Sequence, residues 1–154
     1  MSSTSSRFVI TAERVFCADT GLDGPGGVEV QNGKIVASGA SITRDNDGSL
    51  DFPDCLLLPG LVDLHAHPGM STWRYGIDPD TEILPRGTTT VLFQGDAGAH
   101  TWPLFLKTFI EGSKTRVKLA ISPSMKGELE DRGCFVNLHE IDVDACVRTI
   151  EEGN

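Results

Sequence analysis

Two histidines, His65 and His67, carry the clearest chemical signal in the sequence. They follow an apolar run and a Pro59-Gly60 pair, and they stand at positions i and i+2. Alternate side chains of a β-strand point to the same face, so on a strand both imidazoles, together with Asp63, would share one face. Two such imidazoles can bind a divalent metal ion such as zinc, iron or nickel when other strands supply further ligands. The alternative, two histidines on the solvated face of a strand, stays open at this point.

Several other polar side chains are candidates for a site, and each also has an ordinary structural explanation. Asp63 could orient one histidine through the second ring nitrogen, as carboxylates beside metal ligands do, or it could make a hydrogen bond at the strand end. Arg74 follows the strand at the place where active-site loops gather, but a surface arginine is the simpler interpretation. His100 and His139 stand in loops, and we interpret both as loop residues rather than ligands.

The composition is that of an ordinary globular protein with an acidic charge balance. Of the 154 residues, 39% are hydrophobic and 23% are charged, and the formal net charge is −9. This charge argues against nucleic acid or an anionic membrane as a partner, because both require clustered Lys and Arg. There is no apolar run long enough for a membrane helix, and no signal-peptide core follows the polar N-terminus. The scattered cysteines, Cys17, Cys55, Cys134 and Cys146, are typical of small buried hydrophobes in a reducing cytoplasm, so we expect a cytoplasmic protein.

The elements that precede the histidines read as a small β-structure. Residues 8–16 are rich in β-branched and aromatic types and predict a strand, whereas the glycine-rich residues 21–27 predict a turn. Asn32-Gly33 separates two alternating runs, which is typical of a two-residue hairpin because both turn positions need positive φ. After a polar loop, residues 50–58 predict a further strand. Residues 7–58 are therefore expected to form short antiparallel strands, one half of a small β-sandwich.

From residue 59 onward, strands alternate with helices. Strands are predicted at residues 61–67, 88–93 and 117–121, and helices are predicted to begin after the N-caps Asp78, Thr101 and Asp142. The apolar sides of the last two helices are expected to consist of Leu104, Phe105, Phe109 and Ile110, and of Val143, Cys146, Val147 and Ile150. Alternation of this kind makes parallel sheets with right-handed crossovers.

The predicted fold class is α/β, with domains at residues 1–58 and 59–154. The second domain would be the first three β/α units of a TIM-type (β/α)₈ barrel. Three strands cannot close a barrel, and a complete one needs about 250 residues. We therefore expect this chain to be an N-terminal piece of a longer protein.

The run 59–67 (PGLVDLHAH) resembles the first-strand signature of the amidohydrolase superfamily of metal-dependent hydrolases. The chain is more closely similar to the dihydroorotase-like amidohydrolase/deacetylase group. The residues that carry this likeness are 20–26 (TGLDGPG), 75–80 (YGIDPD), 86–91 (RGTTTV), 97–101 (AGAHT) and 113–117 (SKTRV). The group often has Asp where Phe93 stands, which leaves the role of that loop open.

The resemblance implies a binuclear metal centre, usually zinc, with His65 and His67 binding the more buried ion. A carboxylated lysine, two more histidines and an aspartate would complete the site, and a metal-activated hydroxide would attack an amide or ester carbonyl. The catalytic residues are expected beyond Asn154. Lys118 and Lys126 fall earlier than the family's lysine, and a strand lysine reaching for solvent is the ordinary interpretation of Lys118.

Three functional hypotheses follow. In the leading hypothesis, the chain is part of a zinc-dependent amidohydrolase or deacetylase that acts on a small-molecule amide or acetyl ester. We expect neither nucleic acid nor a membrane as a partner, and a homo-oligomer stays possible. The isolated chain is expected to be inactive. The second is a non-catalytic module with a vestigial metal half-site, in which a partner subunit covers the edge of the unfinished sheet. The third is a binding module with one metal ion at His65 and His67.

Overall fold

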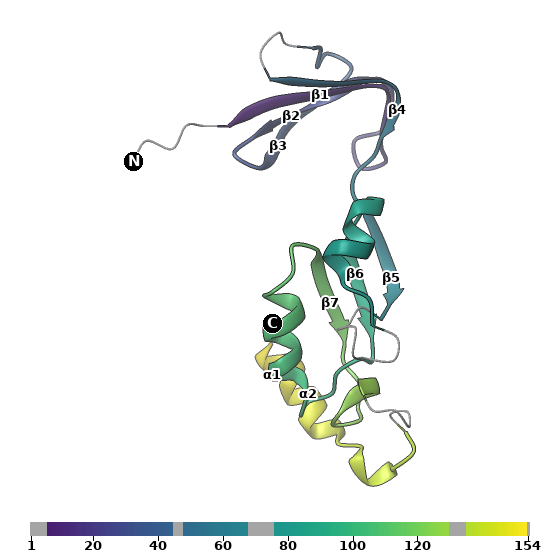
Figure 1. Ribbon diagram of the computed structural model, residues 1–154, viewed down its shortest axis with the longest axis vertical. Coiled ribbons are helices and arrows are strands. Elements are labelled where there is room, and N and C mark those ends of the chain that lie inside the picture. The colour runs from purple at the N-terminus through teal and green to yellow at the C-terminus, as the bar shows by residue number, and fades with distance from the viewer. Residues whose placement is uncertain (1–5, 45–47, 68–75, 130–134, 154) are drawn as a thin grey trace, which may run out of the picture. The chain divides into compact units, whose positions relative to one another are not determined.

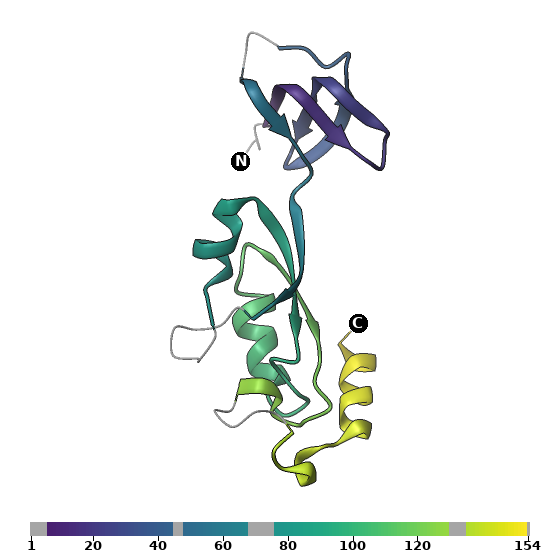
Figure 2. The ribbon, with the colours of Figure 1, turned by 90° about the vertical axis from the view of Figure 1, so that its right-hand side faces the viewer.

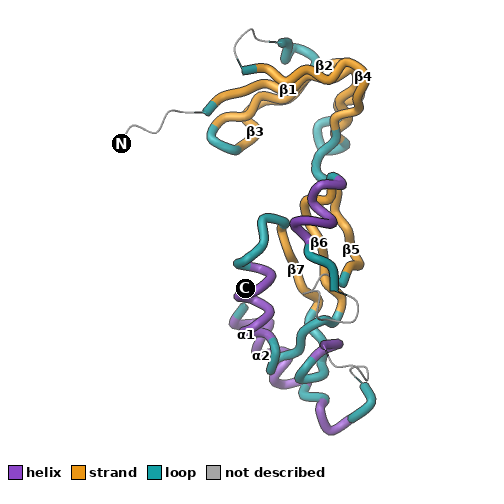
Figure 3. The backbone as a smooth tube through the Cα atoms, viewed as in Figure 1, coloured by secondary structure: helices purple, strands orange, loops and turns teal. Residues whose placement is uncertain are grey.

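The computed structural model describes residues 6–44, 48–67, 76–129 and 135–153. Two compact units divide the chain, Met1–Pro59 and Gly60–Asn154, and each is described by itself. Each unit has its own sheet, and all helical segments of the described residues belong to the second unit (Figure 3).

The first unit is a four-stranded sheet with the strand order β3-β2-β1-β4. Its strands are β1 (Arg7–Cys17), β2 (Leu22–Gln31), β3 (Lys34–Gly39) and β4 (Ser49–Leu57). The predicted hairpin is confirmed: Gln31 pairs with Lys34, and Asn32 and Gly33 have φ values of 52° and 75°. The expectation of purely antiparallel strands is wrong, because β4 pairs with β1 in parallel.

The glycine-rich residues 21–27 are not the turn that the sequence predicts. The turn lies at residues 18–21, and β2 already begins at Leu22 and pairs with β1. Gly26 serves close approach of neighbouring strands instead: a Cβ atom on Gly26 would lie 2.5 Å from the carbonyl oxygen of Gly39. A missing side chain, rather than turn geometry, explains why glycine stands at this position.

The second unit contains the parallel sheet β5-β6-β7 and the helical segments between and after its strands (Figures 1 and 2). The strands are β5 (Leu61–Ala66), β6 (Thr88–Gln94) and β7 (Arg116–Ala120). The helical segments are η1 (Pro79–Ile83), η2 (Leu84–Arg86), α1 (Trp102–Phe105), η3 (Leu106–Ile110), η4 (Gly127–Leu129), η5 (Leu138–Glu140) and α2 (Val143–Glu152). This order confirms the predicted alternation of strands and helices.

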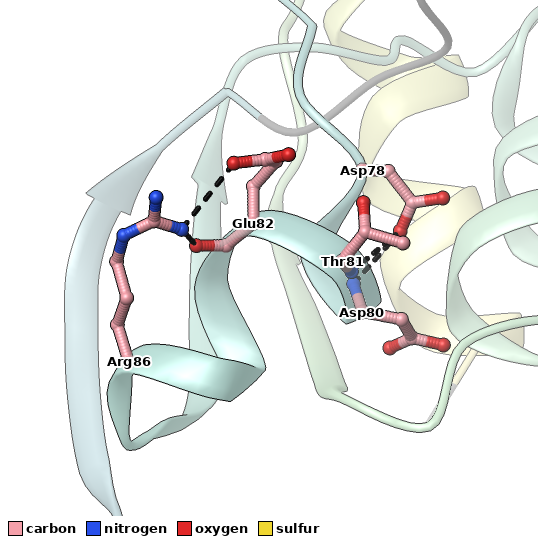
Figure 4. A network of polar contacts seen from close by, with 5 residues as sticks. All are labelled: Asp78, Asp80, Thr81, Glu82 and Arg86. Atoms are coloured by element: carbon pink, nitrogen blue, oxygen red, sulfur yellow. Dashed lines mark hydrogen bonds and ion pairs between the residues drawn. The ribbon is translucent and has the colours of Figure 1, made fainter.

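Side chains define the starts of two helices as the sequence predicts. Asp78 accepts hydrogen bonds from the backbone N–H groups of Asp80 and Thr81 at the start of η1 (Figure 4). Asp142 accepts one from the backbone N–H of Ala145 at the start of α2. These carboxylates satisfy donors that a helix leaves unpaired in its first turn. At the other end of the first helical pair, Arg86 donates to the backbone carbonyl of Glu82 and forms an ion pair with its carboxylate (Figure 4).

The core of the second unit is built around three phenylalanines. Phe93 of β6 and Phe105 of α1 are fully buried, with ring centroids 5.0 Å apart and nearly perpendicular planes. Phe109 joins them, and Val91, Val117, Ile83 and Ala97 complete the cluster. The prediction for Leu104 is wrong, because its side chain is 58% exposed. On α2, only Cys146 of the predicted apolar side is buried, whereas Val143, Val147 and Ile150 are exposed.

Asp80 connects η1 to the segment that leads into β7. Its Oδ1 accepts hydrogen bonds from the backbone N–H and the hydroxyl of Thr115, at 2.8 and 2.7 Å, and its Oδ2 accepts one from the backbone N–H of Lys114 at 2.8 Å. Burial by itself would raise the pKa of Asp80, but these three hydrogen bonds outweigh it, so the pKa lies below its ordinary value.

The described residues bear on two expectations, one about membrane helices and one about the burial of the cysteines. None of their helices is long and apolar enough to cross a membrane. Among the described cysteines, Cys146 is buried and Cys17 is partly buried, but Cys55 is exposed, so the expectation of a buried hydrophobe is wrong for Cys55. Cys134 lies outside the described residues.

Candidate metal centre

The site forms where the carboxyl ends of β5 and β6 meet. His65 is in β5, His67 follows the strand directly, and Asp96 stands two residues after the end of β6. The two strands are parallel, and Ala66 pairs with Phe93, so their ends lie at the same edge of the sheet. A hydrogen bond from the side chain of Gln94 to the carbonyl of Leu64, 2.8 Å long, joins the strands just before this edge.

The imidazoles of His65 and His67 point their Nε2 atoms at each other. These atoms are 3.2 Å apart, and the rings meet edge to face with centroids 5.2 Å apart. Two imidazole nitrogens bound to one tetrahedral zinc ion at its usual bond length would be separated by about 3.3 Å. The sequence prediction that both imidazoles share one face is therefore confirmed, and the spacing of their Nε2 atoms suits two ligands of one ion.

Asp96 contacts the opposite nitrogen of His67. Its Oδ1 lies 3.1 Å from Nδ1 of His67, and the residue is only 6% exposed. Its other oxygen, Oδ2, is buried without a hydrogen-bond partner among the described residues. Burial raises the pKa of Asp96, the hydrogen bond and charge of His67 oppose that rise, and the nearby Glu128 adds to it.

Asp96 is not part of any motif that marks a site in the sequence. An available signal was its position, because an acidic residue just after the second parallel strand lies at the same sheet edge as residues just after the first. Among the small and polar residues 94–99, Asp96 is the one carboxylate.

The loop that carries Asp96 is held by backbone hydrogen bonds on both sides of it. Gly95 N–H donates to the carbonyl of Ala120, and the carbonyl of Gly95 accepts from Glu128 N–H at 2.9 Å. The carbonyl of Ala97 accepts from the N–H of Ser122, also at 2.9 Å. This ladder fixes the backbone on which the Asp96 side chain is mounted.

Gly98 lets the same loop pack tightly against the segment after β7. A Cβ atom on Gly98 would lie 1.7 Å from the carbonyl oxygen of Ser124, so no larger residue fits there without a backbone shift. Thr101, predicted as the cap of the next helix, makes no side-chain cap for α1. Its hydroxyl contacts the carbonyls of Gly98 and Lys126 instead, which adds a further link between the two segments.

The other polar residues considered for the site make structural contacts or have no described contact with the two histidines. The carboxylate of Asp63 accepts a 3.0 Å hydrogen bond from the backbone N–H of His65, which is the strand-end alternative rather than a contact with a ring nitrogen. His100 and His139 are exposed, and so is Lys118. Lys126 forms an ion pair with Glu140 at 3.2 Å. Arg74 and its neighbours lie outside the described residues.

The described residues offer two ligands to a metal ion and not a complete set. No group of three or more His, Cys, Asp or Glu side chains within the described ranges is arranged to hold an ion. Zinc in proteins takes four ligands in structural sites and three protein ligands in catalytic ones. The two Nε2 atoms therefore fit one part of a metal centre, and further ligands must come from elsewhere.

Comparison with known proteins gives the family. No family model matches the chain. It is 31% identical over 125 residues to a deacetylase of Agrobacterium fabrum, covering 78% of this chain and 26% of that protein. It is 30% identical over 107 residues to an allantoinase of Arabidopsis thaliana, covering 62% of this chain and 21% of that protein. The chain thus spans about a quarter of the length of these curated relatives.

Solved structures share the fold of this chain. The crystal structure of a dihydroorotase matches with a TM-score of 0.80 over 95% of this chain and 39% of that chain, at 23% identity. That likeness concerns the fold alone, and it confirms the predicted class of barrel. Deacetylase, allantoinase and dihydroorotase relatives, together with this fold, show that the chain belongs to the amidohydrolase superfamily.

Proposed function

We propose that this chain supplies the first metal ligands of a metal-dependent hydrolase that cleaves a C–N bond in a small-molecule amide, or an acetyl ester. The observation that carries the proposal is the 3.2 Å separation of the Nε2 atoms of His65 and His67 at the carboxyl edge of a parallel sheet. Barrels of this kind hold their active sites at that edge. The relatives named deacetylase, allantoinase and dihydroorotase support a hydrolase.

His65 and His67 would hold the ion through their Nε2 atoms. The bound metal, for which we propose zinc and two ions in a complete site, supplies a Lewis acid and a nucleophilic hydroxide at neutral pH. The chain's own residues then have three tasks: to direct two Nε2 atoms at the ion, to hold the two rings in place, and to keep the second nitrogen of His67 in a hydrogen bond. The scattered cysteines support a cytoplasmic location for such an enzyme.

The test is made on the protein as its source organism makes it, isolated with an antibody against this chain. Elemental analysis should find zinc or a related metal, and the protein should hydrolyse at least one of three probes: an N-acetyl amino acid, allantoin or dihydroorotate. A chelator should abolish that hydrolysis and added Zn²⁺ should restore it. Hydrolysis that survives complete metal removal would contradict the proposal.

A second candidate, a module that binds a partner subunit without catalysis, is favoured by one observation. Leu61, Val62 and Leu64 of β5 are 50%, 57% and 67% exposed, although apolar strands of parallel sheets are normally covered. The mass of the isolated protein separates the two. A species near 40 kDa, roughly a sandwich plus a barrel, supports the enzyme. A species of 16.6 kDa without bound metal supports the module.

A further inference from the structure

A carboxylate that no motif marks stands behind one of the two histidines. The Oδ1 atom of Asp96 is 3.1 Å from Nδ1 of His67, while Nε2 of the same ring faces Nε2 of His65. We propose that Asp96 is the positioning residue of this site: its carboxylate holds the His67 ring as the Nδ1–H tautomer and so keeps Nε2 bare for a metal ion. The metal part of this inference rests on the proposed function.

The tautomer follows from the chain of contacts. Each neutral imidazole carries one proton, so a hydrogen bond between the two Nε2 atoms requires one ring to donate and the other to accept. If His67 donated from Nε2, its bare Nδ1 would face the acceptor oxygen of Asp96 at 3.1 Å, and the contact would be repulsive. If His65 donates, His67 accepts at Nε2 and donates from Nδ1 to Asp96, and both contacts are satisfied. The arrangement therefore selects Nε2–H for His65 and Nδ1–H for His67.

The carboxylate nearest in sequence already has another partner. Asp63 is closer to His67 in sequence than Asp96, but its carboxylate accepts from the backbone N–H of His65. Asp96 itself uses Oδ1 on the nitrogen that lies on the far side of the ring from the Nε2 pair, which is the place of an orienting group rather than that of a ligand in this arrangement.

The backbone around Asp96 is fixed in the way that an orienting group requires. Hydrogen bonds involving Gly95 and Ala97 hold the residues on either side of it, and Gly98 packs against the carbonyl of Ser124. A carboxylate mounted on such a loop keeps its direction when a metal ion binds to the bare Nε2 of the ring in front of it. Among the described residues the buried Oδ2 of Asp96 has no hydrogen-bond partner, and a buried carboxylate oxygen without a partner costs free energy.

The test reads the ring nitrogens of the ¹⁵N-labelled chain by long-range ¹H–¹⁵N spectroscopy at neutral pH without metal. The wild-type chain should show His67 protonated at Nδ1 and His65 protonated at Nε2. In Asp96→Ala, His67 should become a mixture of tautomers, whereas Asp96→Asn, turned so that its amide oxygen accepts, should restore the Nδ1–H form. Asp63→Ala is the matched control, and it should leave the His67 tautomer unchanged.

The same resonances follow a titration with Zn²⁺. Loss of an orienting partner typically weakens metal binding about 10- to 100-fold, so Asp96→Ala should bind Zn²⁺ that much more weakly than wild type. A wild-type His67 protonated at Nε2, or an Asp96→Ala variant with an unchanged tautomer, would overturn the role of Asp96. If neither the wild-type chain nor any variant binds Zn²⁺, the proposed function fails. The tautomer measurement then still decides the role of Asp96. The dispersion of backbone amide signals checks that each variant is folded.

Discussion

The Nε2 atoms of His65 and His67 lie 3.2 Å apart, on rings that come from one strand and its immediate continuation. The geometry of a strand, which puts alternate side chains on one face, produces this proximity. On the opposite side of the His67 ring, Nδ1 contacts the carboxylate of Asp96. The site therefore depends on two strands, β5 for the rings and β6 for the carboxylate behind them.

Replacement of either histidine should remove metal binding and hydrolysis together. His65→Ala or His67→Ala deletes a direct ligand, so we expect metal affinity to fall by more than the roughly 100-fold that loss of an orienting partner costs. Metal content and hydrolysis rates of the protein from its source, carrying each substitution, provide the measurement. The control is His100→Ala, because His100 is an exposed loop residue. Equal metal content in the His67→Ala and His100→Ala proteins would contradict a ligand role for His67.

The aromatic cluster should dominate the stability of the second unit. Phe105 is fully buried against Phe93 and Phe109, so Phe105→Ala should lower the free energy of unfolding by about 3–5 kcal/mol. The adjacent Leu104 is the matched control: its side chain is 58% exposed, and Leu104→Ala should change stability by no more than about 0.5 kcal/mol. Urea unfolding followed by circular dichroism measures both. Similar losses for the two variants would show that the cluster is not the core.

Asp80 should make stability depend on pH in the acid range. Its pKa in the folded chain lies below the ordinary value of 3.8, so its contribution is present above that value and is lost as the pH falls through the lower folded pKa. Asp80→Asn should cost about 2 kcal/mol at pH 7, because it weakens hydrogen bonds from Lys114 and Thr115 that are partly screened by solvent.

Unfolding curves from pH 7 down to pH 3 test this dependence on Asp80. The difference between wild type and Asp80→Asn should shrink as the pH falls below the ordinary pKa of 3.8 and should disappear below the lower pKa of the folded chain. Glu151→Gln, on the exposed end of α2, serves as the control for loss of one negative charge. A difference that stays constant down to pH 3 would exclude the carboxylate of Asp80 as its source.

Gly98 should be far more sensitive to substitution than a glycine in open space. Gly98→Ala would place a Cβ atom 1.7 Å from a backbone oxygen that cannot rotate away, so we expect a loss of more than about 3 kcal/mol. Gly33→Ala meets no atom within 4 Å and bears only the strain of its positive φ, about 1–2 kcal/mol. Thermal unfolding compares the two, and a smaller loss for Gly98→Ala would be inconsistent with tight packing of this loop.

The sequence by itself determined the local features whose causes lie within a few residues. Asn32-Gly33 specified its hairpin because two adjacent positive φ angles favour these residues. Asp78 and Asp142 marked the starts of η1 and α2 because a carboxylate satisfies the free N–H groups of a first turn. The alternation of strands and helices predicted the parallel sheet, and the His-x-His spacing predicted that both rings share a face.

Tertiary structure decided everything that depends on residues far apart in the chain. The exposure of Leu104, and of Val143 on α2, depends on what packs against each helix, which the apolar pattern of one helix does not contain. The parallel pairing of β4 with β1 arises from pairing between distant segments. Asp96 is 29 residues from His67, and only the meeting of two parallel strand ends brings its carboxylate to the imidazole. Spacing within one strand predicted the two candidate ligands, whereas contact between strands brings Asp96, the group proposed to orient His67, to its ring.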